Sequence, residues 1–267
     1  MNTEALGLLT TGSVTVLGRL PHSSNYTFLV LVSPRDGGAD AVPSENGSPP
    51  FVPPTSLDAT LFAEAEPGCQ VAVYKPGDGE RPLWDFPGGL YKREIASYRL
   101  SSALGWDIVP ETVARDDAPL GPGSLQRFVD ADFETHYFHL AEEERFHDAL
   151  VTVAVFDVLV NNTDRKAGHL LLDADERIWA IDNGLAFHEE SKLRTVIWDF
   201  AGEPIPDHLI ASIASVAEGD GTLLDPLVPY LDASEIAALG GRARSLLRTG
   251  RMPSIQPGER PYPWPII

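Results

Sequence analysis

The stretch from residue 156 to residue 187 limits the possible folds more than any other part of this 267-residue chain. It begins inside an apolar run, 151–160, which ends in a polar cluster, 161–166. Two short apolar runs, 169–172 and 178–181, follow, and an Asp-rich segment of turn-forming residues separates them. Two short apolar segments joined by such a turn are typical of a β-hairpin.

The expected hairpin predicts which polar side chains meet. A hairpin brings the start of its first strand beside the end of its second strand. With a turn centred near Asp175, Gly168 and His169 lie opposite Asp182 and Ile181. We therefore expect Asp164, His169 and Asp182 to gather at the open end of the hairpin.

Two of these side chains are carboxylates, and this pairing favours a particular chemistry. Asp164 and Asp182 would repel each other unless a proton or a metal ion separates them. Mg²⁺, a hard cation that prefers oxygen ligands, is one ion that fits. One carboxylate that orients a hydroxyl and a second that holds metal is the arrangement found in kinases. The alternative is that these residues form ordinary Asx turns. That alternative is the better explanation for either Asp considered alone, but not for Asp164, His169 and Asp182 together at this spacing.

The composition is that of a globular protein of a reducing compartment. Hydrophobic residues make up 43% of the chain, and a single cysteine, Cys69, excludes an internal disulfide. No apolar run approaches the length of a membrane span, and the first twelve residues lack the features of a signal peptide. We expect a cytoplasmic protein with no integral membrane association.

The net charge of −19, from 39 acidic and 20 basic residues, restricts the partners. Such a chain is repelled by the phosphates of nucleic acid, so a nucleic-acid partner is disfavoured. An anionic lipid surface attracts basic patches, and the sequence shows none. The charge therefore weighs against a lipid substrate as well.

The polar motifs of the hairpin stretch resemble the catalytic core of the phosphatidylinositol 3-/4-kinase-like superfamily, most closely the type II phosphatidylinositol 4-kinases. The resemblance rests on Asn-Thr-Asp-Arg at 162–165 and on Ile-Asp-Asn-Gly-Leu-Ala-Phe at 181–187. The chain as a whole resembles an actinobacterial group of kinase-like proteins.

This resemblance implies an α+β, two-lobed protein-kinase-like (lipid-kinase-like) fold. Residues 1–129 would form an N-lobe with an antiparallel sheet, interrupted at 34–68 by a Pro-, Gly- and Ser-rich insertion that we expect to be disordered. Residues 130–267 would form a mainly helical C-lobe that contains the catalytic loop, the activation segment and a Pro-rich tail.

The resemblance also assigns roles to residues of the motifs. Asp164 would be the catalytic-loop aspartate, and Lys166 would stabilise charge on the transferred group, with Arg165 between them. Asp182 would hold the metal ion. His169 stands where the family usually has a metal-binding Asn. Imidazole binds metals, but Mg²⁺ prefers oxygen, which leaves open Mn²⁺, a site for one metal, or weak activity.

Three turn residues would cover the nucleotide phosphates in place of a glycine-rich loop, which the chain lacks. These residues are Ser23, Ser24 and Asn25, between strands expected at 13–20 and 26–32. An ordinary polar hairpin turn explains them about equally well.

A lysine and a glutamate of the N-lobe are candidates for the ion pair of kinases. Lys75 lies on a strand expected at 70–76, and Glu94 lies near the start of a helix expected at 91–104. By the resemblance, Lys75 reaches the nucleotide phosphates and Glu94 steadies it, although most helix glutamates are merely solvated. The neighbouring Arg93 is expected on the surface.

The rest of the chain supplies elements with less specific signals. We expect strands at 108–114 and 124–129, and helices at 3–9, 142–160, 207–218 and 233–247. By the resemblance, backbone groups around Gln126, Phe128 and Val129 would hold the adenine. Lys192 and Arg194, in an activation segment at 188–206, would contact phosphate or substrate, or would be solvated.

These features predict a kinase that uses ATP and Mg²⁺ or Mn²⁺ to transfer the γ-phosphoryl group to a hydroxyl acceptor. The acceptor would be a protein serine or threonine, a lipid or a small molecule. The alternative is a nucleotide-binding pseudokinase that acts as a switch or scaffold. His169 and the missing glycine-rich loop support that alternative.

Overall fold

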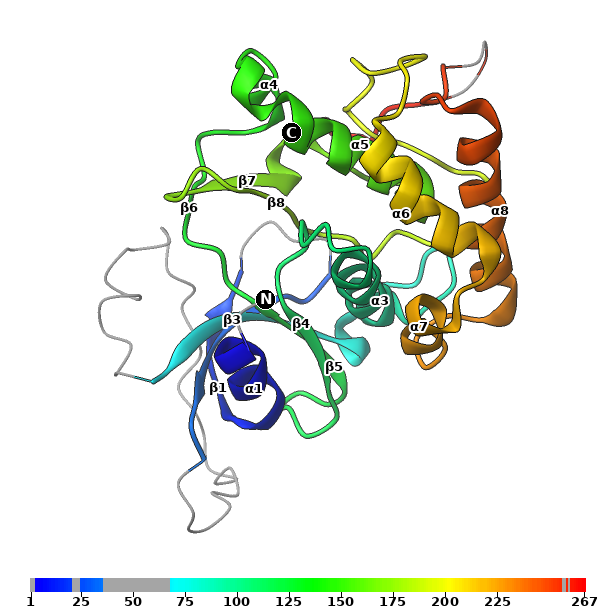
Figure 1. Cartoon of the computed structure of the whole chain (residues 1–267). Helices are drawn as coiled ribbons and strands as arrows, with labels where there is room; N and C mark the ends of the chain where they lie inside the picture. Colours follow the sequence, from blue (N-terminus) through cyan, green and yellow to red (C-terminus); the bar gives the residue numbers. More distant parts are fainter. Residues whose placement is uncertain (1–2, 21–24, 36–67, 256–257, 259) are drawn as a thin grey trace. The chain divides into compact units, whose positions relative to one another are not determined.

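The computed structural model describes residues 3–20, 25–35, 68–255, 258 and 260–267 (Figure 1). Its contacts divide the chain into two compact units. The first comprises residues 1–91 and 111–128, and the second comprises residues 92–110 and 129–267. The predicted lobes were 1–129 and 130–267, so the units differ from them chiefly in residues 92–110, which group with the second unit. The predicted turn residues Ser23 and Ser24 and most of the predicted insertion lie outside the described residues.

The first unit is built on an antiparallel five-stranded sheet. The strand order is β1-β2-β3-β5-β4. The strands are β1 (Ser13–Arg19), β2 (Phe28–Ser33), β3 (Gln70–Pro76), β4 (Thr112–Arg115) and β5 (Gly123–Arg127), preceded by helix α1 (Thr3–Thr11). A 3-10 turn, Gly77–Gly79, follows β3.

Helix α1 covers one face of this sheet, as Figure 1 shows. Leu9 of the helix is buried in one cluster with Val30, Ala72 and Tyr74 of the central strands. The side chain of Arg115 fixes the end of the helix, because it donates to the carbonyls of Leu9 and Gly12, each at 2.9 Å.

The predicted strands of this unit are confirmed to within about two residues, with one exception. The strand expected at 108–114 begins only at Thr112. Ile108 belongs instead to the second unit, where its N–H donates to Ser101 Oγ at 2.9 Å and its carbonyl accepts from Ala180 N at 2.7 Å. Pro110 follows and has no N–H to donate to a sheet.

The second unit is mainly helical. Its longer helices are α3 (Leu90–Ala103, from Lys92 on in this unit), α5 (His147–Val160), α6 (Asp207–Glu218) and α8 (Ala233–Thr249). Short helical turns are α4 (Tyr137–Leu140), Glu144–Phe146, Ala167–His169, α7 (Gly221–Leu224) and Asp225–Leu227. A small antiparallel sheet contains β6 (Ala131–Asp132), β7 (Leu170–Asp173) and β8 (Ile178–Ala180).

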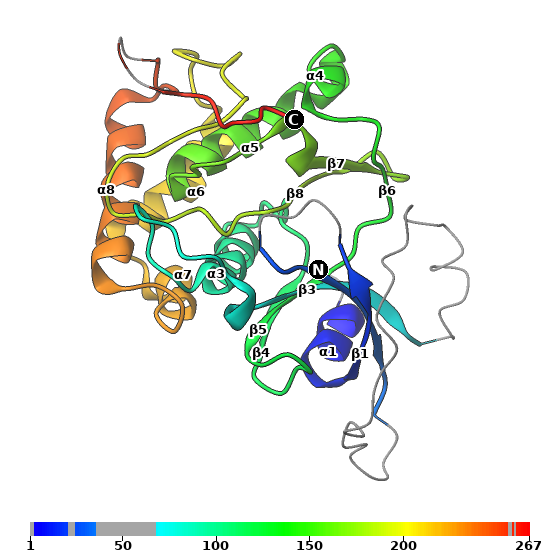
Figure 2. The same ribbon diagram turned by 180° about the vertical axis from the view of Figure 1, so that it is seen from behind.

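Helix α5 is the central helix of this unit and is apolar around most of its circumference, so nine of its fourteen residues are buried. Helices α6 and α8 pack side by side, and α8 also contacts α5 (Figure 2). The helix predicted at 142–160 begins later than expected, at His147. Phe146 N donates to Glu143 O at 3.0 Å, so the preceding residues form a 3-10 turn that buries Phe146. No helix among the described residues is long and apolar enough to span a membrane.

A buried ion pair joins α3 to α8. Arg93 and Glu235 are only 4% and 6% exposed, and their side chains are hydrogen-bonded to each other. Glu235 also accepts from Asp232 N at 2.9 Å and so caps the start of α8. The prediction that Arg93 lies on the surface is wrong, because the charge of Glu235 compensates for its burial.

We expect Glu235→Gln to lower the free energy of unfolding by about 3 kcal/mol, because it removes the carboxylate charge that is hydrogen-bonded to the buried Arg93 guanidinium. Urea unfolding checks this. Glu218→Gln, at the exposed end of α6, is the matched control and should change stability by less than about 0.5 kcal/mol. Equal stability of the two variants would contradict a stabilising ion pair.

Candidate active site

The predicted catalytic segment is organised by a single buried side chain, Arg165. Helix α5 ends at Val160, and Asn161 caps it in the left-handed conformation, with φ 56°. The chain then passes through Arg165, whose side chain is completely buried. Arg165 Nε lies 3.1 Å from both carboxylate oxygens of Asp157 on α5.

The remaining donors of Arg165 reach the end of the hairpin. One terminal nitrogen donates to Ile181 O and the other to Asn183 Oδ1, each at 2.6 Å. A guanidinium offers its donors in a rigid, planar arrangement. Arg165 therefore fixes the position of the segment after β8 relative to helix α5.

The hairpin has the predicted register. Leu170 pairs with Ala180 and Leu172 with Ile178, so the turn centres at Asp175. Ile181 N donates to His169 O at 2.9 Å, which confirms that His169 lies beside the end of the second strand.

The backbone reverses direction immediately after the hairpin. Asp182 has φ 57°, a left-handed conformation that Asp tolerates better than most residues. Its side chain is 50% exposed, whereas the next residue, Asn183, is completely buried. The turn thus presents the Asp182 carboxylate and anchors the backbone behind it.

Asn183, which was not among the predicted site residues, anchors this turn. Its Nδ2 donates to Ala180 O at 3.1 Å, while its Oδ1 accepts from Arg165. Its backbone N–H donates to Glu94 Oε2 at 3.0 Å, and Glu94 is only 2% exposed. Glu94 therefore supports the turn that carries Asp182. The Asn-Gly dipeptide signals a turn but not these tertiary contacts.

Four of the predicted site side chains are brought together in two pairs. Lys166 Nζ lies 3.3 Å from Asp164 Oδ2, and His169 Nε2 lies 3.3 Å from Asp182 Oδ2. Burial raises the pKa of the Asp164 carboxyl to about 6; Lys166 opposes this rise and the negative charge of Asp182 adds to it. Asp164 therefore changes protonation close to neutral pH, as a general base requires.

The donor set fits a metal ion that shares its coordination with a ligand. Among the described residues, no group of three His, Cys, Asp or Glu side chains gathers to hold a metal. Mg²⁺ is commonly bound by one or two carboxylates together with substrate phosphates and water rather than by a cage of protein ligands. Asp182 and His169 would supply one carboxylate and one imidazole to such an ion.

The predicted activation segment is hydrogen-bonded to the predicted catalytic loop. Arg194 N donates to Asn162 O at 2.9 Å, and Arg165 N donates to Arg194 O at 3.1 Å. Thr195 Oγ1 donates to Asp157 Oδ2 at 3.0 Å, so the second carboxylate oxygen of Asp157 also binds this segment. The Asn161 side chain adds bonds to His188 O and Glu190 O at 2.9 and 2.6 Å.

The predicted nucleotide contacts of the first unit have other partners. Asn25 Oδ1 accepts from Arg81 N at 2.8 Å, and Gln126 Nε2 donates to Thr112 Oγ1 at 2.9 Å. Lys75 is half-buried on β3, opposite Ser124 of β5. The Lys75–Glu94 ion pair stays a prediction.

The predicted hinge residues fall on both sides of the boundary between the units. Phe128 ends the first unit, where its N–H donates to Val71 O at 3.1 Å. Val129 begins a stretch of the second unit and packs with Leu171 and Trp179. Their predicted role in holding adenine through the backbone stays a prediction.

Comparison with known sequences finds a kinase family model and two related proteins, one from a mycobacterium and one from a plant. A family model described as phosphatidylinositol 3- and 4-kinase matches residues 102–223. Protein Rv2133c of Mycobacterium tuberculosis is 37% identical over 295 residues, which cover 97% of this chain and 94% of that protein. Phosphatidylinositol 4-kinase gamma 8 of Arabidopsis thaliana is 27% identical over 210 residues, 61% of this chain and 39% of that protein.

Solved structures share the fold at low sequence identity. The crystal structure of the Golgi casein kinase with Mn/ADP bound superposes with a TM-score of 0.52 at 12% identity, covering 96% of this chain and 80% of that chain. Hydra Fam20 with sugar gives a TM-score of 0.53 at 12% identity, covering 92% and 86%. The predicted α+β, two-lobed kinase-like fold is thereby confirmed.

The sequence matches cover the catalytic loop and the hairpin, and the match to Protein Rv2133c extends over almost the whole of both chains. The chain therefore belongs to the phosphatidylinositol 3-/4-kinase-like superfamily, in the group that includes Protein Rv2133c.

Proposed function

We propose that the protein is an ATP-dependent phosphotransferase that transfers the γ-phosphoryl group of ATP to a hydroxyl group. The observation that carries this proposal is the pairing of Asp164–Lys166 and His169–Asp182 at the end of one hairpin, around the buried Arg165. Membership of the superfamily and the kinase-like fold support it.

Asp164 would act on the acceptor hydroxyl. As the hydroxyl oxygen forms a bond to the γ-phosphorus, the bond between that phosphorus and the β–γ bridging oxygen breaks and ADP leaves. The hydroxyl proton passes to the Asp164 carboxylate. Lys166, 3.3 Å from that carboxylate, would orient it and would neutralise charge on the transferred group.

Asp182 and His169 would hold the metal ion, Mg²⁺ or Mn²⁺. The ion would neutralise phosphate charge during the transfer. A nitrogen ligand suits Mn²⁺ better than it suits Mg²⁺, since Mg²⁺ strongly prefers oxygen. The chain's own contribution is to fix Asp182 in its left-handed turn through the Asn183 contacts to Arg165 and Glu94.

Two of the predicted site residues would act in a different way from the one predicted. Arg165 is completely buried, and its donors are occupied by Asp157, Ile181 and Asn183, so we assign it to positioning and not to contact with substrate. Glu94 would also position the Asp182 turn. The residues proposed to contact the nucleotide are Lys75, Ser23, Ser24, Asn25, Gln126, Phe128 and Val129.

The acceptor would be a protein serine or threonine, a lipid or a small molecule, and the net charge of −19 favours an acceptor that is not on an anionic surface. A nucleotide-binding pseudokinase is the second candidate, favoured by His169 in place of the family's usual Asn. His169→Asn separates the two, because a weakened enzyme should gain turnover whereas a pseudokinase should show none in either form.

We expect Asp182→Ala to abolish metal-dependent binding of ATP, because it removes the anionic metal ligand. Asp164→Asn should keep that binding but lower phosphoryl transfer by at least about a hundredfold. Calorimetry with ATP and Mn²⁺, and release of ADP, measure the two effects. Asp175→Ala, which removes an exposed carboxylate from the turn of the same hairpin, is the control. Full transfer by Asp164→Asn would refute its role as the base.

Asp164 also predicts a pH dependence of stability. Its pKa is about 6 in the folded protein against about 3.9 for an ordinary Asp, so the folded state binds the proton more tightly. The stability that this proton contributes is present below pH 4 and is lost as the pH rises through 6.

Urea unfolding of the wild type and Asp164→Asn from pH 4.5 to pH 7.5 tests this dependence. The stability of the variant relative to the wild type should increase across this range by at most about 3 kcal/mol, because the variant cannot ionise. Parallel pH profiles for the two proteins would contradict a raised pKa.

A further inference from the structure

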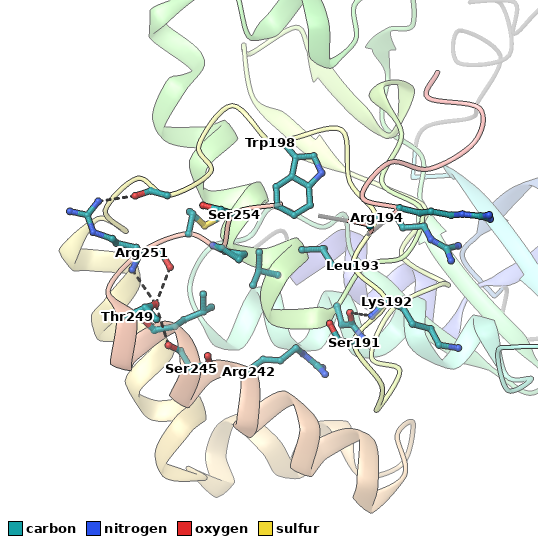
Figure 3. Close-up of a pocket in the computed structure, with 18 residues that line it drawn as sticks. Ser191, Lys192, Leu193, Arg194, Trp198, Arg242, Ser245, Thr249, Arg251 and Ser254 are labelled. Carbon is teal, nitrogen blue, oxygen red and sulfur yellow. Dashed lines mark hydrogen bonds between the residues drawn. The ribbon is translucent and has the colours of Figure 1, made fainter. Parts of the chain in front are cut away.

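A large pocket lies in the second unit, apart from the proposed catalytic residues. Its volume is about 880 Å³. Its walls are the end of α5, the segment 191–198, the C-terminal half of α8 and the chain that follows α8 (Figure 3). Neither Asp164 nor Asp182 lines it, so the proposed phosphoryl transfer leaves this pocket without a role.

The pocket is basic in a strongly acidic protein. Five of its lining residues carry positive charge: Lys192, Arg194, Arg242, Arg251 and Arg260. None of its described lining residues is Asp or Glu, although the whole chain has a net charge of −19. A concave surface lined by one sign of charge concentrates ligands of the opposite sign.

Arg242 of α8 is the most informative of these residues. Its Nε donates to Leu159 O at 2.8 Å, and one terminal nitrogen donates to His188 O at 3.3 Å. The other terminal nitrogen is buried and has no hydrogen-bond partner among the described residues. Burial lowers the pKa of this guanidinium to about 10.

The hydrogen bonds that Arg242 makes to described residues all go to carbonyl groups, and the nearby carboxylate of Glu235 is hydrogen-bonded to Arg93. An anion in the pocket would add a counter-charge for Arg242. The partnerless nitrogen of Arg242 and the neighbouring basic side chains therefore point to an anionic ligand. Planar guanidinium groups bind the oxygens of phosphate especially well, because two parallel hydrogen bonds can form.

The other part of the pocket is apolar. Trp198 contributes an indole ring whose Nε1 already donates to Pro261 O at 3.1 Å, so the ring has no unsatisfied polar atom. Leu193, Leu246 and Met252 also line the pocket. In Figure 3, Lys192 and Arg194 lie at one end of the cavity, while Trp198 and Leu193 lie nearer its middle.

We propose that this pocket binds an organic phosphate, that is, a phosphate monoester carried on an apolar or aromatic group. The positive charge of Arg242, Arg194 and the other basic side chains attracts the phosphate, and the apolar group packs against Trp198. Both a soluble aryl or alkyl phosphate and the headgroup of a lipid carry this chemistry. Binding here does not depend on the proposed phosphoryl transfer.

Calorimetric titration of the full chain without added metal tests the proposal. The probes are phenyl phosphate for a soluble ester, dihexanoyl phosphatidic acid below its micellar concentration for a lipid, and tripolyphosphate for an anion without an apolar part. We expect at least one organic phosphate to bind saturably, at one site per chain and more tightly than tripolyphosphate. The tighter of the two organic probes identifies the soluble or the lipid source, and either result supports the proposal.

Substitutions locate the binding site. Arg242→Gln should weaken binding by about tenfold or more, because a charge-assisted hydrogen bond is lost. Arg194→Gln should have a similar effect and is the safer variant, since the bonds from Arg194 to Asn162 and Arg165 involve its backbone and not its side chain. Arg244→Gln, an exposed residue on α8 that does not line the pocket, is the matched control and should bind normally.

Two further variants separate this site from the catalytic one. Trp198→Leu should weaken binding of the organic phosphates more than binding of tripolyphosphate, and Asp182→Ala should leave both unchanged. Absence of saturable binding of either organic probe, or equal binding by the wild type, Arg242→Gln and Arg194→Gln, would overturn the proposal. Tripolyphosphate that binds as tightly as the organic probes would also overturn it.

Discussion

The hydrogen-bonded ion pair between Arg165 and Asp157 is the interaction on which the proposed site depends. Both side chains are completely buried, and burying charge is costly unless every donor and acceptor is satisfied. Here Arg165 also binds Ile181 O and Asn183 Oδ1, while Asp157 also accepts from Thr195. One charged pair thus joins helix α5, the predicted catalytic loop, the end of the hairpin and the predicted activation segment.

This arrangement separates rigid groups from reactive groups. The buried Arg165–Asp157 pair holds the backbone in place, while the carboxylates of Asp164 and Asp182 remain partly exposed. Preorganised charges of this kind stabilise a transition state without having to rearrange during the reaction. Glu94 connects helix α3 to these residues, because it accepts a hydrogen bond from Asn183 N while Asn183 Oδ1 accepts one from Arg165. The side chains that would contact substrate are therefore few, and most polar residues nearby serve to position them.

The sequence was sufficient to predict the hairpin, its register and the meeting of His169 with Asp182, because these depend on local turn chemistry and on a strand period of two. The sequence was insufficient to predict the burial of charged side chains whose partners lie far away along the chain. Arg93 was expected on the surface, yet Glu235, 142 positions later, compensates for its burial. The burial of Arg165 and the support that Glu94 gives to Asn183 depend on the same kind of tertiary pairing. The basic pocket also assembles from segments far apart in the chain.

The most direct measurement is calorimetric titration of the full chain with a non-hydrolysable ATP analogue, with and without Mg²⁺ or Mn²⁺. If the pairs at the end of the hairpin form a metal–nucleotide site, the analogue will bind at one metal-dependent site, and Mn²⁺ will support tighter binding than Mg²⁺ because His169 supplies nitrogen. Absence of binding, or equal affinity with and without metal, would contradict a catalytic site built from Asp164, His169 and Asp182.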